Sequence, residues 1–426
     1  MKKTIVSLVF LQVGSVLAVA APVTDISVRQ RWPWSPKVDI IFSVGKGEKS
    51  DIELSATWDG RTEPLALTAA NGLAGRSFGL VSEQGHVVWD PRAAGITNAL
   101  TGFKVSAESV VAASRTWLVI DLVSGAHQYF AAPPDGDWTA DVYKESKMVF
   151  RRVEGRSFTM GYTADQRAAC KAAGGPNDWH MNFWKDHQVV LNDDYYLAVY
   201  RVTRLQASYL STGKAYDDDG TYHNWRSGSG WSRADYRGNT NEVNRARWPD
   251  DGYNVTPASL FGRFRALTGN IFTIDLPTEA QWENAARNGT DTLWDVGGDV
   301  STITTEAFNA YVSRFVNFET TEVGLKEAST LGFYDLYGRA LELCLDIWRK
   351  TLPATETDPI GPTFAETGSS SFVARGMGAN VSSTKCGFCV PAQRINYDGG
   401  NEGDYTSTAY GNYVVRPCIH LNSLFD

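Results

Sequence analysis

The sequence predicts an α+β protein in which an N-terminal β-sandwich is followed by a second domain with sparse secondary structure. Apolar and polar residues alternate with a period of two in the first third of the chain, which is typical of strands with one buried face. Only two later segments carry clear helix signals, and long stretches rich in glycine, tryptophan and aspartate show no period. The 426 residues exceed the usual size of one domain, and 43% hydrophobic residues are enough for packed cores.

The first 20 residues have the pattern of a secretory signal peptide. Lys2 and Lys3 precede an apolar run over 5–17, and Ala18-Val19-Ala20 supplies the small residues of a cleavage site. The run is shorter than the roughly 20 residues that span a bilayer, and no later segment is longer and as apolar. We therefore expect a secreted or periplasmic protein without an integral membrane segment after cleavage. An uncleaved membrane anchor is the alternative.

The charge balance is acidic. The formal net charge is −8, and removal of Lys2 and Lys3 leaves 38 basic against 48 acidic residues. No basic block with interleaved aromatic residues offsets this charge. We therefore expect no nucleic-acid partner.

The N-terminal β domain is predicted over residues 24–113. Alternation over 38–44 and 52–58 flanks a turn rich in glycine and charge at 45–49. Further short strands are predicted at 77–80, 86–89 and 103–107. Short strands at regular spacing favour an immunoglobulin-like sandwich, which acts either as an adhesion or positioning module or as a stabilising accessory domain.

A connecting region is predicted over 114–148, with its clearest linker at 131–137, and the second domain over 149–423. One helix of that domain is predicted from Pro257, in the tolerated first position, to Leu267. Its residues Leu260, Phe261, Phe264 and Leu267 form an apolar stripe that we expect to be core.

The other helix is predicted over 279–288. Thr278 and Gln281 have the spacing of a capping box, and Gly289 follows the helix. Glu279 and Glu283 are four apart and share one face. Acid–base work is one interpretation, but in a first helical turn the commoner role of such carboxylates is to favour the helix dipole while remaining solvated.

Five segments occur in the order found in the sulfatase-modifying factors, over roughly residues 150–421, and resemble that family. They are Phe158–Gly161, His187–Leu191 with Tyr195–Leu197, Leu276–Arg287, Leu331–Glu342, and Arg375–Gly378 followed by Ala392–Arg394. The family includes the formylglycine-generating enzyme, which oxidises a cysteine of a client sulfatase to formylglycine. The resemblance implies a fold related to C-type lectin domains and, for an active member, a sulfatase client.

The resemblance also implies calcium. The family's turn places carboxylates at Asp335 and Glu342 and main-chain carbonyls at Gly338 and Ala340, and hard oxygen donors suit this ion. Arg339 replaces the family's asparagine and either points away or takes the place of the ion by pairing with Asp335 or Glu342. A second calcium site would begin at Asn309, although its later ligands are not recognisable.

The catalytic chemistry of the family rests on two cysteines that hold copper(I), for which thiolates are suitable ligands. Counting back from Arg394 places the first at Cys386 and the second at Pro391, so the pair is degenerate. Cys389 is a substitute ligand if the backbone at Gly387 turns tightly, and a disulfide among Cys386, Cys389 and Cys418 is the alternative. The Glu of the family's E-V-T motif is replaced by Arg201.

Two functions therefore remain open. One is a module that binds a protein or glycan ligand, with Trp225 and Trp231 lining the binding surface or lying in the core. The other is a copper-dependent oxidase that converts a client cysteine to formylglycine, with Cys386, Cys389 and Arg394 in the site. Membership in a family does not decide between them, because fold and function are separable.

Overall fold

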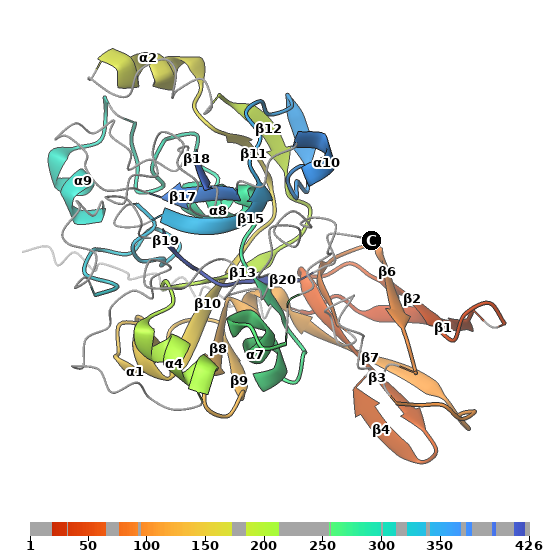
Figure 1. Cartoon of the computed structure of the whole chain (residues 1–426). Coiled ribbons are helices and arrows are strands. Elements are labelled where there is room, and N and C mark those ends of the chain that lie inside the picture. Colours follow the sequence, from red (N-terminus) through yellow and green to blue (C-terminus); the bar gives the residue numbers. More distant parts are fainter. Residues whose placement is uncertain are drawn as a thin grey trace, which may run out of the picture.

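The computed structural model describes residues 19–31, 33–64, 76–92, 95–172, 185–212, 255, 257–299, 301–311, 322–337, 341–367, 372–376, 394–397 and 413–421. Strands dominate, and the helices are short (Figure 1). The α+β class predicted from the sequence is confirmed. Residues 1–18 of the predicted signal peptide lie outside these residues, as do Trp225, Trp231, Cys386 and Cys389.

Two antiparallel sheets form the N-terminal part. One has the order β1-β2-β6, and in the other β3 pairs with β4, β5 and β7. Burial alternates strictly along β2, and the inner faces of β2, β3 and β6 share one apolar cluster. The strand bounds are β1 Val23–Gln30, β2 Val38–Val44, β3 Ser50–Trp58, β4 Arg61–Pro64, β5 Arg76–Leu80, β6 Gln84–Trp89 and β7 Lys104–Val111.

A six-stranded sheet of order β14-β20-β13-β10-β8-β9 begins the second part, with α1, α4 and α7 near it (Figure 1). Strands β8 and β9 come from the segment 114–148, so part of that segment is built into this sheet. The elements are η1 Ala112–Arg115, β8 Trp117–Asp121, β9 His127–Phe130, α1 Val142–Glu145, β10 Lys147–Val153, β13 Tyr195–Ala198, α4 Arg204–Thr212, α7 Leu260–Leu267, β14 Thr273–Asp275 and β20 Cys418–His420.

Helix α7 begins at Leu260, later than the predicted start at Pro257. The side chain of Ser259 accepts a hydrogen bond from the Gly262 N–H at 3.1 Å and so caps the helix. Pro257 lies in the turn before this cap. The predicted apolar stripe does pack into the core beside the six-stranded sheet.

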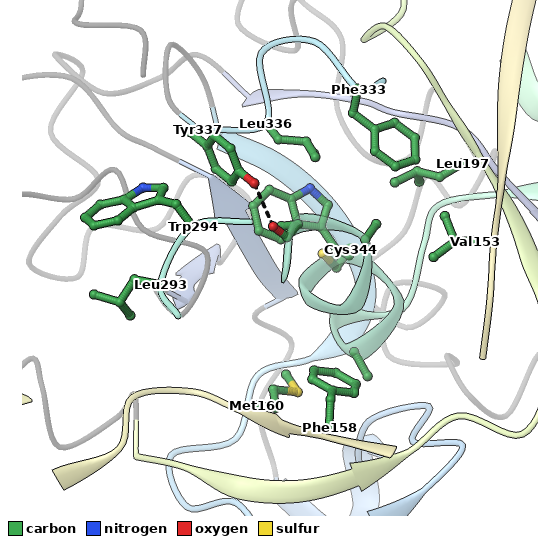
Figure 2. Packing of buried hydrophobic residues seen from close by; sticks show 14 of the residues in the cluster. Val153, Phe158, Met160, Leu197, Leu293, Trp294, Phe333, Leu336, Tyr337 and Cys344 are labelled. Atoms are coloured by element: carbon green, nitrogen blue, oxygen red, sulfur yellow. Dashed lines mark hydrogen bonds between the residues drawn. The ribbon is translucent and has the colours of Figure 1, made fainter. Parts of the chain in front are cut away.

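Two smaller sheets, of order β11-β12-β16 and β18-β17-β15-β19, complete the described part, and α8 packs against β11, β15 and β17 (Figure 1). Figure 2 shows the apolar cluster around this helix. The elements are β11 Ser157–Met160, α2 Ala164–Ala172, β12 His187–Val190, α8 Glu279–Arg287, α9 Thr305–Tyr311, β15 Leu341–Ile347, β16 Thr355–Thr357, α10 Phe364–Thr367, β17 Phe372–Gly376, β18 Arg394–Tyr397 and β19 Tyr413–Val414.

A buried ion network joins the sandwich to the six-stranded sheet. Arg152 of β10 donates from Nη1 to both carboxylate oxygens of Asp51 of β3 at 2.9 Å, and from Nε to Asp194 at 2.8 Å. Lys49 also donates to Asp194, at 2.7 Å. Asp51 has no exposed surface. The network therefore ties the start of β3 to β10.

No helix among the described residues is both long enough and apolar enough to cross a membrane.

Candidate functional site

Helix α8 carries the segment that most resembles the sulfatase-modifying factors, and it is buried on all sides. Both halves of the predicted capping box are present, with Gln281 N–H donating to Thr278 Oγ1 at 3.2 Å and Thr278 N–H donating to Gln281 Oε1 at 2.9 Å. The Glu279 N–H donates to Asp346 of β15 at 2.6 Å. Every residue of the helix is buried, so its charged side chains require partners inside the protein.

Glu283 is the centre of the first ion cluster. It accepts hydrogen bonds from Gly161 N–H at 2.8 Å, from Arg287 Nε at 2.7 Å and from Arg375 Nη1 at 2.6 Å. Arg375 also holds Glu279, with Nε donating at 2.9 Å. Burial favours the neutral acid, but the charges of Arg375 and Arg287 outweigh it and lower the pKa of Glu283.

The predicted solvation of the two helix carboxylates is therefore wrong. Glu279 is 3% exposed and Glu283 is fully buried. The local preference of a first helical turn for acidic residues is real, but here tertiary contacts with Arg375 decide where the side chains lie. Both carboxylates act as fixed ion-pair partners rather than as solvated groups.

Glu342 of β15 is the centre of a second cluster. Arg201 Nε donates to its Oε1 at 2.7 Å, Arg416 donates to both oxygens at 2.8 and 2.9 Å, and Trp282 Nε1 donates to Oε2 at 2.6 Å. Glu342 and both arginines have no exposed surface. Burial opposes ionisation, but Arg416 and Arg201 lower the pKa of Glu342 to about 2.

The groups that surround the Glu342 carboxylate do not fit a calcium ion there. Both of its oxygens are held by guanidinium groups, and two neighbouring cations disfavour a third. Asp335 Oδ2 accepts from Gly324 N–H at 2.7 Å, and its main-chain oxygen accepts from Arg201 at 2.5 Å. Gly338, Arg339 and Ala340 lie outside the described residues, so the complete set of calcium ligands stays a prediction.

The second expected calcium position, Asn309, lies on α9 and is exposed. Its main-chain oxygen accepts a hydrogen bond from Lys326 Nζ at 2.5 Å. Within the part of the chain that the structure describes, no group of three His, Cys, Asp or Glu side chains is arranged to hold a metal ion.

Arg394, the expected companion of the copper-binding cysteines, opens β18. Its backbone stands in register with Arg375 of β17, which in turn stands in register with Glu342 of β15. The candidate catalytic residue therefore lies on a strand adjacent to the ion clusters. Cys386 and Cys389 lie outside the described residues, and so does the Arg394 side chain.

Cys344 and Cys418 are free thiols and are fully buried. The Cys418 thiol lies 3.7 Å from Gln281 Oε1 and donates to it. Burial raises the pKa of both thiols well above the usual range. Because the thiolate is the nucleophile and the metal ligand, neither residue is suited to redox or copper chemistry.

Three arginines were not predicted as partners of the buried carboxylates. Arg201 and Arg375 were noted only as members of family segments, and Arg416 was not singled out. Arg416 does carry a signal, because it is a lone charge among Val414, Val415 and Ile419 of the buried C-terminal strand region. A charge in such a run needs an opposite charge from elsewhere in the fold.

Comparison with known proteins identifies the family. A family model for the sulfatase-modifying factor enzyme 1-like domain matches residues 141–406, more than half of the chain. Among solved structures, the chain is similar to Treponema denticola variable protein 1, with 18% identity, a TM-score of 0.39, and coverage of 64% of this chain and 95% of that one. No curated protein matches. Over residues 141–406, which contain both ion clusters except for Arg416, this chain belongs to the sulfatase-modifying factor enzyme 1-like family.

Proposed function

We propose that this chain is an exported binding protein whose family domain recognises a protein or glycan ligand and has lost cysteine oxidation. The observation that carries the proposal is Pro391, which stands where the family has its second copper-binding cysteine. The state of the central motifs agrees with it. Glu279, Glu283 and Glu342 are each held by buried arginines, which leaves none of them free to move a proton. These residues therefore serve to build the scaffold.

The cysteines support the same proposal. Of the two positions that hold copper in active relatives, one is Pro391, which offers no ligand. Cys344 and Cys418 do not replace it, because burial keeps both thiols protonated. Copper-dependent oxidation is the second candidate, and it requires Cys386 and Cys389 together.

Copper(I) titration of the reduced chain separates the two functions. We expect no tight site, and no difference between the unmodified chain and the Cys386→Ser and Cys389→Ser variants. Cys418→Ser is the matched control, because it removes a thiol that is buried. Stoichiometric binding that is lost in Cys386→Ser and Cys389→Ser, but kept in Cys418→Ser, would overturn the proposal and favour the oxidase.

Ligand recognition is tested by a glycan array and by protein capture, with Trp225→Ala and Trp231→Ala beside the unmodified chain. Loss of a specific signal in either variant supports a binding surface at these tryptophans. Equal signals in all three proteins would mean that these two side chains do not line it.

A further inference from the structure

The β-sandwich contains a cavity of about 600 Å³ at the end far from the second part. The ion network that joins the two parts uses Lys49 and Asp51 at the start of β3. The cavity lies toward the other end, where Trp58 at the end of β3 packs on Trp89 and Phe103, with ring centroids 6.1 and 6.4 Å apart. Its volume falls within the roughly 300–1,000 Å³ of small-molecule sites.

The cavity arises because one inner row of the first sheet is only partly covered. Gln30, Val38 and Trp89 stand in register across β1, β2 and β6, so their side chains share a face. Val38 and Trp89 belong to the core between the sheets, whereas Gln30 is exposed and Val28, which precedes it on the same face, is 42% exposed. The sandwich is therefore open between its sheets at this end.

The floor of the cavity is aromatic and apolar. Trp89 and Phe103 stack with centroids 5.3 Å apart and planes 6° from parallel, and Val28, Val38 and Leu100 also line the space. Such a floor favours a flat apolar ring over a ligand that is polar on every side.

The polar groups of the cavity select the head group of the ligand. Among the described residues that line it, Arg92 is the charged one, and Gln30, Thr97 and Asn98 are polar and exposed.

We infer that the open end of the sandwich is a binding site for an apolar ring that carries a carboxylate. The ring lies against Trp89 and Phe103, and the carboxylate pairs with Arg92. A small aromatic acid and the C-terminal aromatic residue of a peptide share this chemistry. The site is independent of the function proposed for the second part.

The full chain is titrated with N-acetyl-phenylalanine and, separately, with its uncharged amide. Binding is measured by ligand-observed NMR. We expect saturable binding of the acid and weaker binding of the amide. Arg92→Gln should weaken the acid about tenfold, the loss typical of one charged hydrogen bond, and leave the amide unchanged. Val28→Trp fills the cavity and should abolish binding of both.

Val81→Trp is the matched control, because Val81 is also in the sandwich and is 40% exposed, but it does not line the cavity. It should bind like the unmodified chain. Acetyl-Gly-Gly-Phe distinguishes the two sources of the ligand: tighter binding than N-acetyl-phenylalanine indicates a peptide terminus, and equal binding indicates a small acid. Three results would overturn the inference. They are a titration that does not saturate, equal effects of Val28→Trp and Val81→Trp, and binding of glucuronate in preference to the aromatic acid.

Discussion

Replacing Glu283 with glutamine tests whether the central motif builds the scaffold. Glu283 Oε1 accepts from Gly161 and Arg287, and Oε2 accepts from Arg375. Glutamine has nearly the same shape but places an NH₂ group at one of these two positions. In either orientation of the amide, an N–H then faces another hydrogen-bond donor. Arg287 and Arg375 also lose one of the two carboxylates that neutralise them, because Glu279 alone remains charged.

Removing one partner of a buried ion pair costs about 3–5 kcal/mol. We expect the free energy of unfolding to fall by this amount, and the melting temperature to fall on the order of 10 °C. Urea denaturation followed by tryptophan fluorescence measures the first quantity, and calorimetry the second. Glu306→Gln, an exposed carboxylate on α9, is the control and should change stability by less than about 0.5 kcal/mol.

The pH dependence has a definite sign. Because the folded-state pKa of Glu283 is lowered, its ionisation stabilises the fold fully above the unfolded value near 4.3, and this contribution is lost as the pH falls below that value. The difference between the unmodified chain and Glu283→Gln should therefore shrink in acid. A loss below about 1 kcal/mol at neutral pH would contradict the scaffold role, since it falls well short of the cost of breaking a buried pair.

Three further predictions follow from the same contacts. Asp51→Asn leaves Arg152 short of a partner and should cost about 3 kcal/mol in urea denaturation; a loss under about 1 kcal/mol would mean that the network does not hold the two parts together. Chelation with EDTA should leave the melting temperature within about 1 °C, because guanidinium groups already neutralise Glu342; a larger fall would show that a bound metal ion stabilises the fold. In a Cys386→Ser/Cys389→Ser background, Cys418 should react with a disulfide reagent only after denaturation, and rapid labelling of the native chain would contradict its burial.

Local patterns predicted the elements whose cause is local. Strands β2 and β3 follow from alternation over 38–44 and 52–58, because a sheet with one buried face imposes a period of two. The capping box at Thr278 predicted the start of α8 because both of its hydrogen bonds lie within four residues. The start of α7 was predicted wrongly, since two helix-start signals compete there and the cap at Ser259 prevails over the proline.

The ion clusters could not be predicted in this way, because their partners are far apart in the chain. Arg375 meets Glu283 across 92 positions, and Arg201 meets Glu342 across 141. No periodic or capping rule relates such positions. The sequence does show that a carboxylate such as Glu342 lies in an apolar strand, and hence that a buried partner must exist, but only the fold identifies which arginine it is.

The two ion clusters also explain how a chain can keep the family's sequence segments without the family's catalytic chemistry. Loss of one member of a buried cluster leaves an uncompensated charge that costs about 3–5 kcal/mol, a large part of a typical domain's stability. Replacement of a metal-binding cysteine leaves no such uncompensated charge. Under the function that we propose, the chain keeps Glu283, Glu342 and Arg375 because folding requires them, whereas folding does not require a cysteine at position 391, which is proline. Resemblance over α8 and β15 is evidence for the scaffold, and activity must be tested at the cysteines.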